Sequence, residues 1–367
     1  RLWELDAARG LMLVLMTLTH LPTRLTTPLG QPLGFVSAAE GFVLLSAFMA
    51  GMVYGRVGWR SGVIAMRQAF LRRALKIYRY HAVLLFLLFT VVAAAGSAMH
   101  EPAVRNLMSF YLRAPLDAIT AGLLLVYQPP LLDILPMYVL FMLVSPWLLG
   151  WGQRHGWIWT LAGSAALWLG AQFGLSPWLY SCVVAATSLP VPYGEMGAFD
   201  LLAWQLVWVL GLWLGWRRSL PVPRPLLLPR PVVWLALLAA AIGMAWRHWS
   251  GQAAFGADEA LNLLFDKWLL GPLRLLNLLA LVVLALRFGP ACMAKLPRMP
   301  WLELLGTASL PVFCAQLLAV LLALTFFGDD PLRHAWWVDA LLLAGSFALL
   351  TLVARWSTTA APAKNPR

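Results

Sequence analysis

The sequence has few charged residues and few cysteines. Charged residues make up 11% of its 367 residues, 61% are hydrophobic and the mean hydropathy is +0.77. Soluble domains carry about 25% charged residues, so the shortage of charge excludes an ordinary soluble domain. The three cysteines, Cys182, Cys292 and Cys314, lie in or beside apolar segments and lack the spacing of metal ligands. We interpret them as packing residues and expect no metal site.

Long apolar segments make up most of the chain. A helix that spans a bilayer needs about 20 mostly apolar residues. The first segment is too polar for a cleavable signal peptide and lacks a cleavage site. A shorter apolar stretch at 115–127 favours a re-entrant or interfacial piece. The pattern predicts an all-α, polytopic transmembrane helical bundle of about ten spans, at residues 3–22, 35–55, 80–98, 131–151, 157–175, 199–216, 231–248, 266–287, 305–327 and 336–356.

The positions of Lys and Arg set the expected orientation, because cytoplasmic loops carry an excess of both. Placing residue 1 in the cytoplasm makes 56–79 the first cytoplasmic loop, with seven cations. The same choice puts most of the 27 Lys and Arg residues on one side. We therefore expect both termini in the cytoplasm. This distribution explains most of the net charge of +12 without a nucleic-acid partner.

The sequence reads as a single transmembrane domain over residues 1–356, without an obvious repeat. The proline-rich link at 217–231 cannot form a long helix, so we expect a stiff cytoplasmic connector between six spans and four. Residues 357–367 have the composition of a disordered tail.

The first apolar segment carries a stripe of polar residues. Arg9 and His20 lie within about 20° of each other on one helix face, about 16 Å apart along the axis. Ionisable groups in lipid are costly and mark a site or a buried pair. Asp6, one turn before Arg9, is its expected partner. His20 could act as a general base on a hydroxyl. Alternatively, Arg9 snorkels to the headgroups and His20 caps the outer end.

The second apolar segment offers a partner for this imidazole. Glu40 lies at the depth expected for His20, where a carboxylate would orient the imidazole and raise its basicity. The alternative is a buried hydrogen bond that locks two helices. Ala47, Gly51 and Gly55 recur every four residues, which allows the close approach of another helix or of a thin substrate arm.

A cluster of cations precedes the third segment. Its members lie within two helical turns at the expected cytoplasmic interface. Retention on the cytoplasmic side is the simpler interpretation. The functional one is a site for phosphates, because several cations on one helix suit a polyphosphate. The cluster consists of Arg72, Arg73, Lys76 and Arg79.

Later segments add further polar residues. Asp133 opens the fourth segment and Asp266 the eighth, where Arg274 follows two turns further in with Asn277 as its polar neighbour. An arginine in lipid without a mate in its own segment could bind a substrate carboxylate. It could equally pair with Asp133 or Glu40 and be structural.

These residues together resemble a known family. The spacing Arg9-x10-His20, preceded by Asp6 in LDAARG, is similar to the Arg/Lys-x10-His signature of the acyltransferase-3 superfamily of membrane acyltransferases. The usual Leu-Ser-Gly ending of segment two is here Leu45-Ser46-Ala47, and Thr307-Ala308 stands where the family often has a further polar residue. Five stretches, in the same order along the chain, resemble the OpgC branch of this superfamily: AAEGFVLLSAFMAGMVYGR, RRALKIYRYH, DILPMYVLFMLVSPWLL, FDKWLLGPLRLLNLLAL and LGTASLPVFCAQLL.

The resemblance implies an O-acyltransferase of the bacterial inner membrane. Its co-substrate would be an acyl-CoA, succinyl-CoA above all, with no permanently bound cofactor, and its acceptor an osmoregulated periplasmic glucan. His20 would be the catalytic histidine and Arg9 its motif partner. We expect three groups of site residues: catalytic His20, Glu40, Arg9 and Asp6; acyl-CoA-binding Arg72, Arg73, Lys76, Arg79, Ser46 and Gly51; and acyl- or acceptor-binding Arg274, Asp133, Asp266 and Asn277.

Other classes of function stay open at this point. A transporter or flippase of a lipid or saccharide would have a similar composition, although no inverted repeat or pair of broken helices is visible. A scaffold for carbohydrate synthesis would not need His20. Within the enzyme class, an acetyltransferase of another surface carbohydrate is the alternative. The sequence does not determine whether the chain forms a homo-oligomer.

Overall fold

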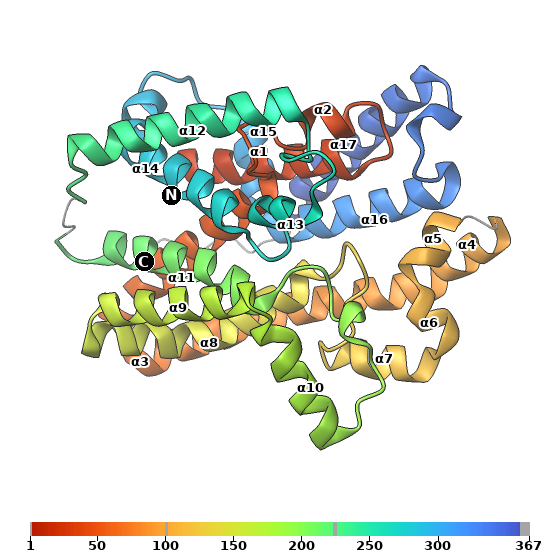
Figure 1. Ribbon diagram of the computed structural model, residues 1–367, viewed down its shortest axis with the longest axis horizontal. Coiled ribbons are helices and arrows are strands. Elements are labelled where there is room, and N and C mark those ends of the chain that lie inside the picture. The colour runs from red at the N-terminus through yellow and green to blue at the C-terminus, as the bar shows by residue number, and fades with distance from the viewer. Residues whose placement is uncertain (1, 100–101, 223–225, 360–367) are drawn as a thin grey trace. The chain divides into compact units, whose positions relative to one another are not determined.

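The structure is a computed structural model that describes residues 2–99, 102–222 and 226–359 (Figure 1). The chain is 79% helical, and the described residues contain no strand. The predicted all-α class is therefore confirmed. The chain forms two compact units, each drawn from separate stretches of sequence. Unit 1 comprises residues 1–30, 82–115 and 296–367, and unit 2 comprises residues 31–81 and 116–295.

Unit 1 contains the first and the last helices of the chain. Two helices, α1 and α15, have the closest backbone approach in this unit. A Cβ added to Gly10 would lie 2.0 Å from the carbonyl oxygen of Leu302, and one added to Gly306 would lie 1.7 Å from that of Asp6. Only glycine permits this contact. The helices of unit 1 are α1 (Trp3–His20), α2 (Thr26–Leu29), η1 (Leu88–Val92), α4 (Ala93–Met99), α5 (Pro102–Leu107), α6 (Ser109–Arg113), α15 (Pro300–Thr307), α16 (Ser309–Phe327), η4 (Pro331–Arg333) and α17 (Trp336–Thr359).

Unit 2 contains most of the remaining helices. Its interior is rich in aromatic side chains, with Trp204 and Trp208 fully buried. The helices are α3 (Ala38–Leu87), whose last turns belong to unit 1, α7 (Pro115–Leu123), α8 (Ile134–His155), α9 (Trp157–Gln172), α10 (Leu175–Thr187), η2 (Tyr193–Glu195), α11 (Leu201–Ser219), α12 (Arg230–Ser250), α13 (Glu259–Asn262), η3 (Leu263–Phe265) and α14 (Pro272–Met293).

The small-residue face of α3 packs against α11. A Cβ on Gly51 would lie 2.3 Å from the carbonyl oxygen of Leu212, and a Cβ on Gly215 would lie 1.9 Å from that of Phe48. Close approach along this face is therefore the approach of another helix. A packing role accounts for Gly51, and its expected contact with a donor arm stays a prediction.

The segment 56–79, expected to be the first cytoplasmic loop, is helical rather than irregular, and its cytoplasmic location stays a prediction. Residues 38–87 are helical, and the helix is interrupted at Gly62, where φ is +85° and ψ is 171°. Glycine adopts this backbone conformation at little cost. Charge had suggested a loop, but Arg and Lys are good helix formers, so a basic stretch can stay helical and exposed.

The other segment boundaries follow the sequence closely. Each of the ten predicted segments falls largely on a helix, and 115–127 contains only the short helix α7. Among the described residues, six helices are long and apolar enough to cross a membrane. The number is seven if α9 and α10, which meet at a bend of 81°, form one span. These helices indicate a multi-pass membrane protein, while ten spans and cytoplasmic termini stay predictions.

The connector and the tail differ in part from expectation. Helix α11 continues to Ser219 and α12 begins at Arg230, so helical ends shorten the connector expected at 217–231. Residues 223–225 of that connector lie outside the described residues. Helix α17 runs to Thr359, into the tail expected to be disordered from 357, and residues 360–367 lie outside the described residues. The units combine stretches from both sides of the connector, and the single-domain organisation stays a prediction.

Candidate functional site

The polar stripe of α1 forms one part of the candidate site, in unit 1. Asp6 is buried at 7% exposure, and Arg9 and His20 are partly buried. The guanidinium of Arg9 donates from Nη2 to the hydroxyl of Ser309, the first residue of α16. This bond joins residues 300 positions apart in the sequence. Ser309 was not among the residues selected from the sequence, because nothing local distinguishes it from other serines.

His20 is oriented within its own helix. Its Nδ1 lies 2.6 Å from the carbonyl oxygen of Met16, one turn earlier. A carbonyl oxygen can only accept, so Nδ1 carries the proton, and in the neutral ring Nε2 is then the basic nitrogen. A backbone carbonyl of α1 thus orients the imidazole.

The ends of α1 and α16 are tied together by the loops that follow them. His334, seven residues after α16 ends, lies with Nε2 3.2 Å from the carbonyl oxygen of Pro22. Arg24 donates to the carbonyl oxygen of His334 at 2.8 Å and forms an ion pair with Asp339 at 2.9 Å. Because Arg9 meets the start of α16 and Pro22 meets the loop after its end, α1 and α16 run parallel. The two helices also pack against each other.

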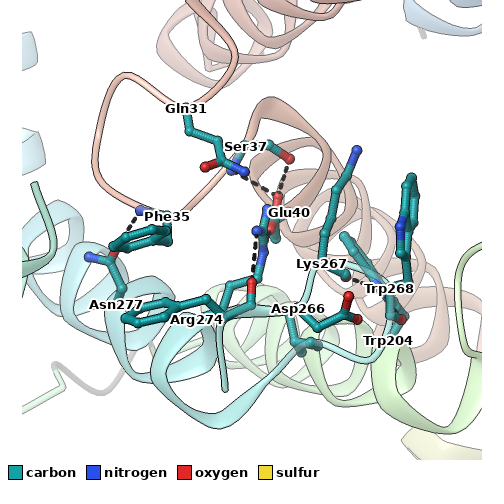
Figure 2. Close-up of polar contacts among 12 residues, drawn as sticks. Gln31, Phe35, Ser37, Glu40, Trp204, Asp266, Lys267, Trp268, Arg274 and Asn277 are labelled. Atoms are coloured by element: carbon teal, nitrogen blue, oxygen red, sulfur yellow. Dashed lines mark hydrogen bonds and ion pairs between the residues drawn. The ribbon is translucent and has the colours of Figure 1, made fainter. Parts of the chain in front are cut away.

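A buried ion pair between Glu40 and Arg274 is the centre of the polar cluster in unit 2 (Figure 2). The side chain of Glu40 is 0% exposed and that of Arg274 is 1% exposed. The structure thus decides between the partners considered for Arg274 in favour of Glu40. Arg274 Nη1 lies 3.4 Å from the carbonyl oxygen of Phe265. Its Nη2 is buried without a hydrogen-bond partner among the described residues.

Glu40 also begins helix α3. Both the backbone N–H and the hydroxyl of Ser37 donate to Glu40 Oε2. This is one half of the capping box, in which the carboxylate three residues into a helix accepts from the N–H of the capping serine. The pattern Ser37-Ala-Ala-Glu40 was visible in the sequence and predicts this role. The expected orientation of His20 by Glu40 would join residues of different units and stays a prediction.

The other carboxylates of the cluster accept hydrogen bonds from backbone N–H groups. Asp133 accepts from Ala198 N at 3.0 Å, and Asp266 accepts from Leu269 N at 2.6 Å. Asp133 precedes the membrane-spanning helix α8, and burial raises the pKa of its carboxyl to about 6. The Ala198 N–H and the charge of Lys267 oppose that rise in pKa. These carboxylates therefore hold loops in place.

Asn277 holds the segment before α3. Its Oδ1 accepts from the backbone N–H of Phe35 at 2.9 Å, while its Nδ2 is buried without a hydrogen-bond partner among the described residues. Added Cβ atoms on Gly34 and Gly243 would lie 2.4 Å from Asn277 Oδ1 and 3.0 Å from the Asn277 amide, respectively. Asn277 is thus enclosed by two glycines, and its Nδ2 donor makes no hydrogen bond among the described residues.

Lys267 is a member of this cluster that the sequence reading did not select. Burial lowers the pKa of its ammonium group, and the charge of Glu40 opposes this lowering while that of Arg274 adds to it. The ammonium nitrogen lies 4.5 Å from the ring centroid of Trp268. The backbone carbonyls of Lys267 and Trp268 accept from the indole of Trp204. Figure 2 shows these residues beside the ion pair.

The residues expected to bind acyl-CoA occupy two different environments on α3. Arg72, Lys76 and Arg79 are exposed, and their spacing places them on one helix face. Arg73 is half-buried beside them. Ser46 is buried at 7% exposure, and its hydroxyl has no hydrogen-bond partner within the part of the chain that the structure describes. The described residues contain no group of three or more His, Cys, Asp or Glu that could hold a metal ion.

Comparison with known proteins bears on both polar clusters. Residues 1–361 match the model of the OpgC protein family. The chain belongs to the OpgC family. The match covers nearly the whole sequence. It includes α1 with Arg9 and His20, and it includes the Glu40–Arg274 cluster. Family membership supports a membrane acyltransferase. No curated protein and no solved structure matches the chain.

Proposed function

We propose that this member of the OpgC family is an O-acyltransferase that moves a succinyl group from cytoplasmic succinyl-CoA to a hydroxyl of a periplasmic glucan. It would do so as a multi-pass protein of the bacterial inner membrane. The observation that carries the proposal is the bond from His20 Nδ1 to the carbonyl of Met16, because it leaves Nε2 as the basic nitrogen. Family membership supports the same class of reaction.

The proposed step is a direct transfer. Nε2 of His20 removes the proton of a sugar hydroxyl, whose oxygen attacks the carbonyl carbon of the thioester. A carbon–oxygen bond forms as the carbon–sulfur bond breaks, and the thiolate of CoA leaves. The imidazolium of His20 returns the proton to that thiolate. A variant route, in which His20 first carries the acyl group, has the same overall balance.

Charged groups of unit 2 are proposed to recognise the donor. The exposed face formed by Arg72, Lys76 and Arg79 suits the phosphates of CoA. Arg274 Nη2 is a buried, charged donor without a hydrogen-bond partner among the described residues. It suits the free carboxylate of a succinyl group, for which Lys267 supplies a second positive charge.

The proposal is tested with purified protein, labelled succinyl-CoA and a periplasmic glucan. The wild-type protein should transfer label to the glucan. His20→Ala should lower the rate by about 100-fold or more, which is the usual contribution of a general base. It should leave the thermal unfolding midpoint near that of the wild type, because the imidazole is only partly buried.

Thr19→Val is the matched control, since Thr19 is adjacent and also donates to the carbonyl of Met16. It should retain most of the transfer activity. Near-normal glucan acylation by His20→Ala would exclude the catalytic assignment. Passage of labelled saccharide or lipid into liposomes without acyl transfer would instead establish a transporter.

A further inference from the structure

Gln316 is a buried amide that the structure leaves entirely unused. It lies on α16 at 0% exposure. Neither its Nε2 nor its Oε1 has a hydrogen-bond partner among the described residues. A buried polar group without a partner destabilises the folded state by its full desolvation penalty. An amide with both ends unsatisfied therefore requires an explanation beyond packing.

The position of Gln316 is defined by its neighbours along α16. Seven residues separate it from Ser309, so the two lie within about 20° on one helix face and about 10 Å apart along the axis. Ser309 accepts the hydrogen bond of Arg9. Gln316 therefore lies on the same face of α16 as Ser309, the residue that Arg9 contacts. Val312 and Val320, both 0% exposed, belong to the same buried face.

The parallel course of α1 and α16 sets the level of Gln316 relative to the catalytic histidine. Arg9 meets the start of α16, and the segment after His20 meets the loop after α16. His20 lies about 16 Å beyond Arg9 on α1, and Gln316 about 10 Å beyond Ser309 on α16. Gln316 is thus at a level between Arg9 and His20, nearer to His20.

We infer that Gln316 binds an amide group of the pantetheine arm of CoA. This inference rests on the proposed function and adds to it that the arm passes along α1 from Arg9 toward His20. Pantetheine contains two secondary amides, each with one N–H donor and one carbonyl acceptor. The carboxamide of Gln316 offers the complementary acceptor and donor, and the apolar side chains of Val312 and Val320 on the same helix face suit the methylene groups of the arm.

The inference is tested by binding rather than turnover, with the full chain in lipid nanodiscs. The probes are CoA and adenosine 3′,5′-bisphosphate, which has the adenosine and phosphate charges at one end of CoA but no pantetheine arm. Gln316→Met keeps a side chain of similar length without the amide. It should raise the Kd of CoA about tenfold and leave the Kd of adenosine 3′,5′-bisphosphate unchanged.

Thr325→Val is the matched control on the same helix. Thr325 is also 0% exposed, but its hydroxyl donates to the backbone carbonyl of Leu321, so this variant should bind both probes as the wild type does. Gln316→Met should be at least as stable as the wild type, because it removes an unsatisfied buried group.

The outcomes separate the inference from the proposed function. An unchanged Kd of CoA in Gln316→Met, with wild-type transfer that requires His20, would overturn the inference alone. Equal weakening of both probes, or a lowered unfolding midpoint, would assign Gln316 a structural role and also overturn it. A wild-type protein that does not bind CoA would overturn the proposed function together with the inference.

Discussion

The polar groups of the two units are used in different ways. In unit 2, Glu40, Asp133 and Asp266 each accept backbone N–H groups at the start of a helix or in a loop. In unit 1, the imidazole of His20 is oriented by a backbone carbonyl of its own helix, and the amide of Gln316 has no hydrogen-bond partner among the described residues. The three carboxylates of unit 2 thus build local structure, whereas the amide of Gln316 in unit 1 contributes no hydrogen bond to the fold among the described residues.

This difference changes how an ionisable residue in a membrane helix is interpreted. Such residues are functional candidates by default, yet Glu40 is occupied by Ser37 and Arg274. The comparison suggests that unsatisfied hydrogen-bonding capacity is a better guide to a ligand site than charge. By that measure, Gln316 and the free ends of Arg274 and Asn277 are stronger candidates than the three carboxylates.

The largest expected effect is on the buried pair of unit 2. Arg274→Met should lower the free energy of unfolding by about 3–5 kcal/mol, because it leaves the buried carboxylate of Glu40 without its partner. The double variant Glu40→Gln/Arg274→Met should recover most of that loss, since Gln still accepts from Ser37. Denaturant unfolding in detergent measures both. A stable Arg274→Met would contradict a structural role for the pair.

A pH dependence is expected from Asp133. Its folded pKa of about 6 lies above the ordinary value of 3.8, so the folded state holds a proton that the unfolded state releases between these values. Stability should fall by about 1–3 kcal/mol as the pH rises from about 4 to about 6, and stay level above that. In Asp133→Asn, which keeps the acceptor for Ala198, this slope should vanish. Unfolding midpoints measured across pH 4–8 decide the matter.

Two glycine substitutions compare the units directly. A methyl group on Gly306 would meet the backbone of α1, and one on Gly215 would meet the backbone of α3. Each alanine should cost about 1–3 kcal/mol of stability through overpacking. Gly306→Ala should also lower acyl transfer per folded molecule, because it displaces the helix that carries His20. Equal transfer activity in the two variants would remove the functional distinction between the units.

Donor selectivity should depend on Arg274. The double variant Glu40→Gln/Arg274→Met, which keeps the fold, should lose about tenfold in its preference for succinyl-CoA over acetyl-CoA, or about 1.4 kcal/mol. Competition between the two labelled donors measures this ratio. If the preference is undiminished, Arg274 serves the fold alone.

The smallest effect is expected on the exposed basic face of α3. Replacing Arg72, Lys76 and Arg79 together by Gln should raise the Kd of CoA severalfold and reduce its dependence on salt, since exposed charges are screened. Turnover at saturating donor should not change. The control replaces the exposed cations Arg56, Arg60 and Arg67 by Gln. If both triple variants bind CoA alike, the face has only a topological role.

Most of the helical framework could be predicted from the sequence, because apolar length alone defines it. The ten apolar segments fall largely on helices. The stretch around Arg72 could not be assigned in this way, since hydropathy does not distinguish an exposed helix from a loop. There, a single glycine at position 62 determines where the helix is interrupted.

The site could be predicted only in its local part. The spacing of Arg9 and His20 follows from helical periodicity, and a capping pattern at Ser37 was available to explain Glu40. The bond of Arg9 to Ser309 joins residues 300 positions apart, and no local pattern encodes it. The unused amide of Gln316 could not be recognised either, because the lack of a partner is a property of the packed structure.

The contact of Gly10 with Gly306 has a consequence for substrate length. Because backbone meets backbone there, α1 cannot slide along α15 by a fraction of a turn without a clash. The distance from Arg9 to His20, about 16 Å along the axis, is set by α1 itself, and the glycine contact keeps both residues at a constant level relative to α15. A thioester whose arm is one amide unit shorter than that of CoA should not reach the imidazole. The length of the arm, as well as the charge of the donor, would then determine which donors react.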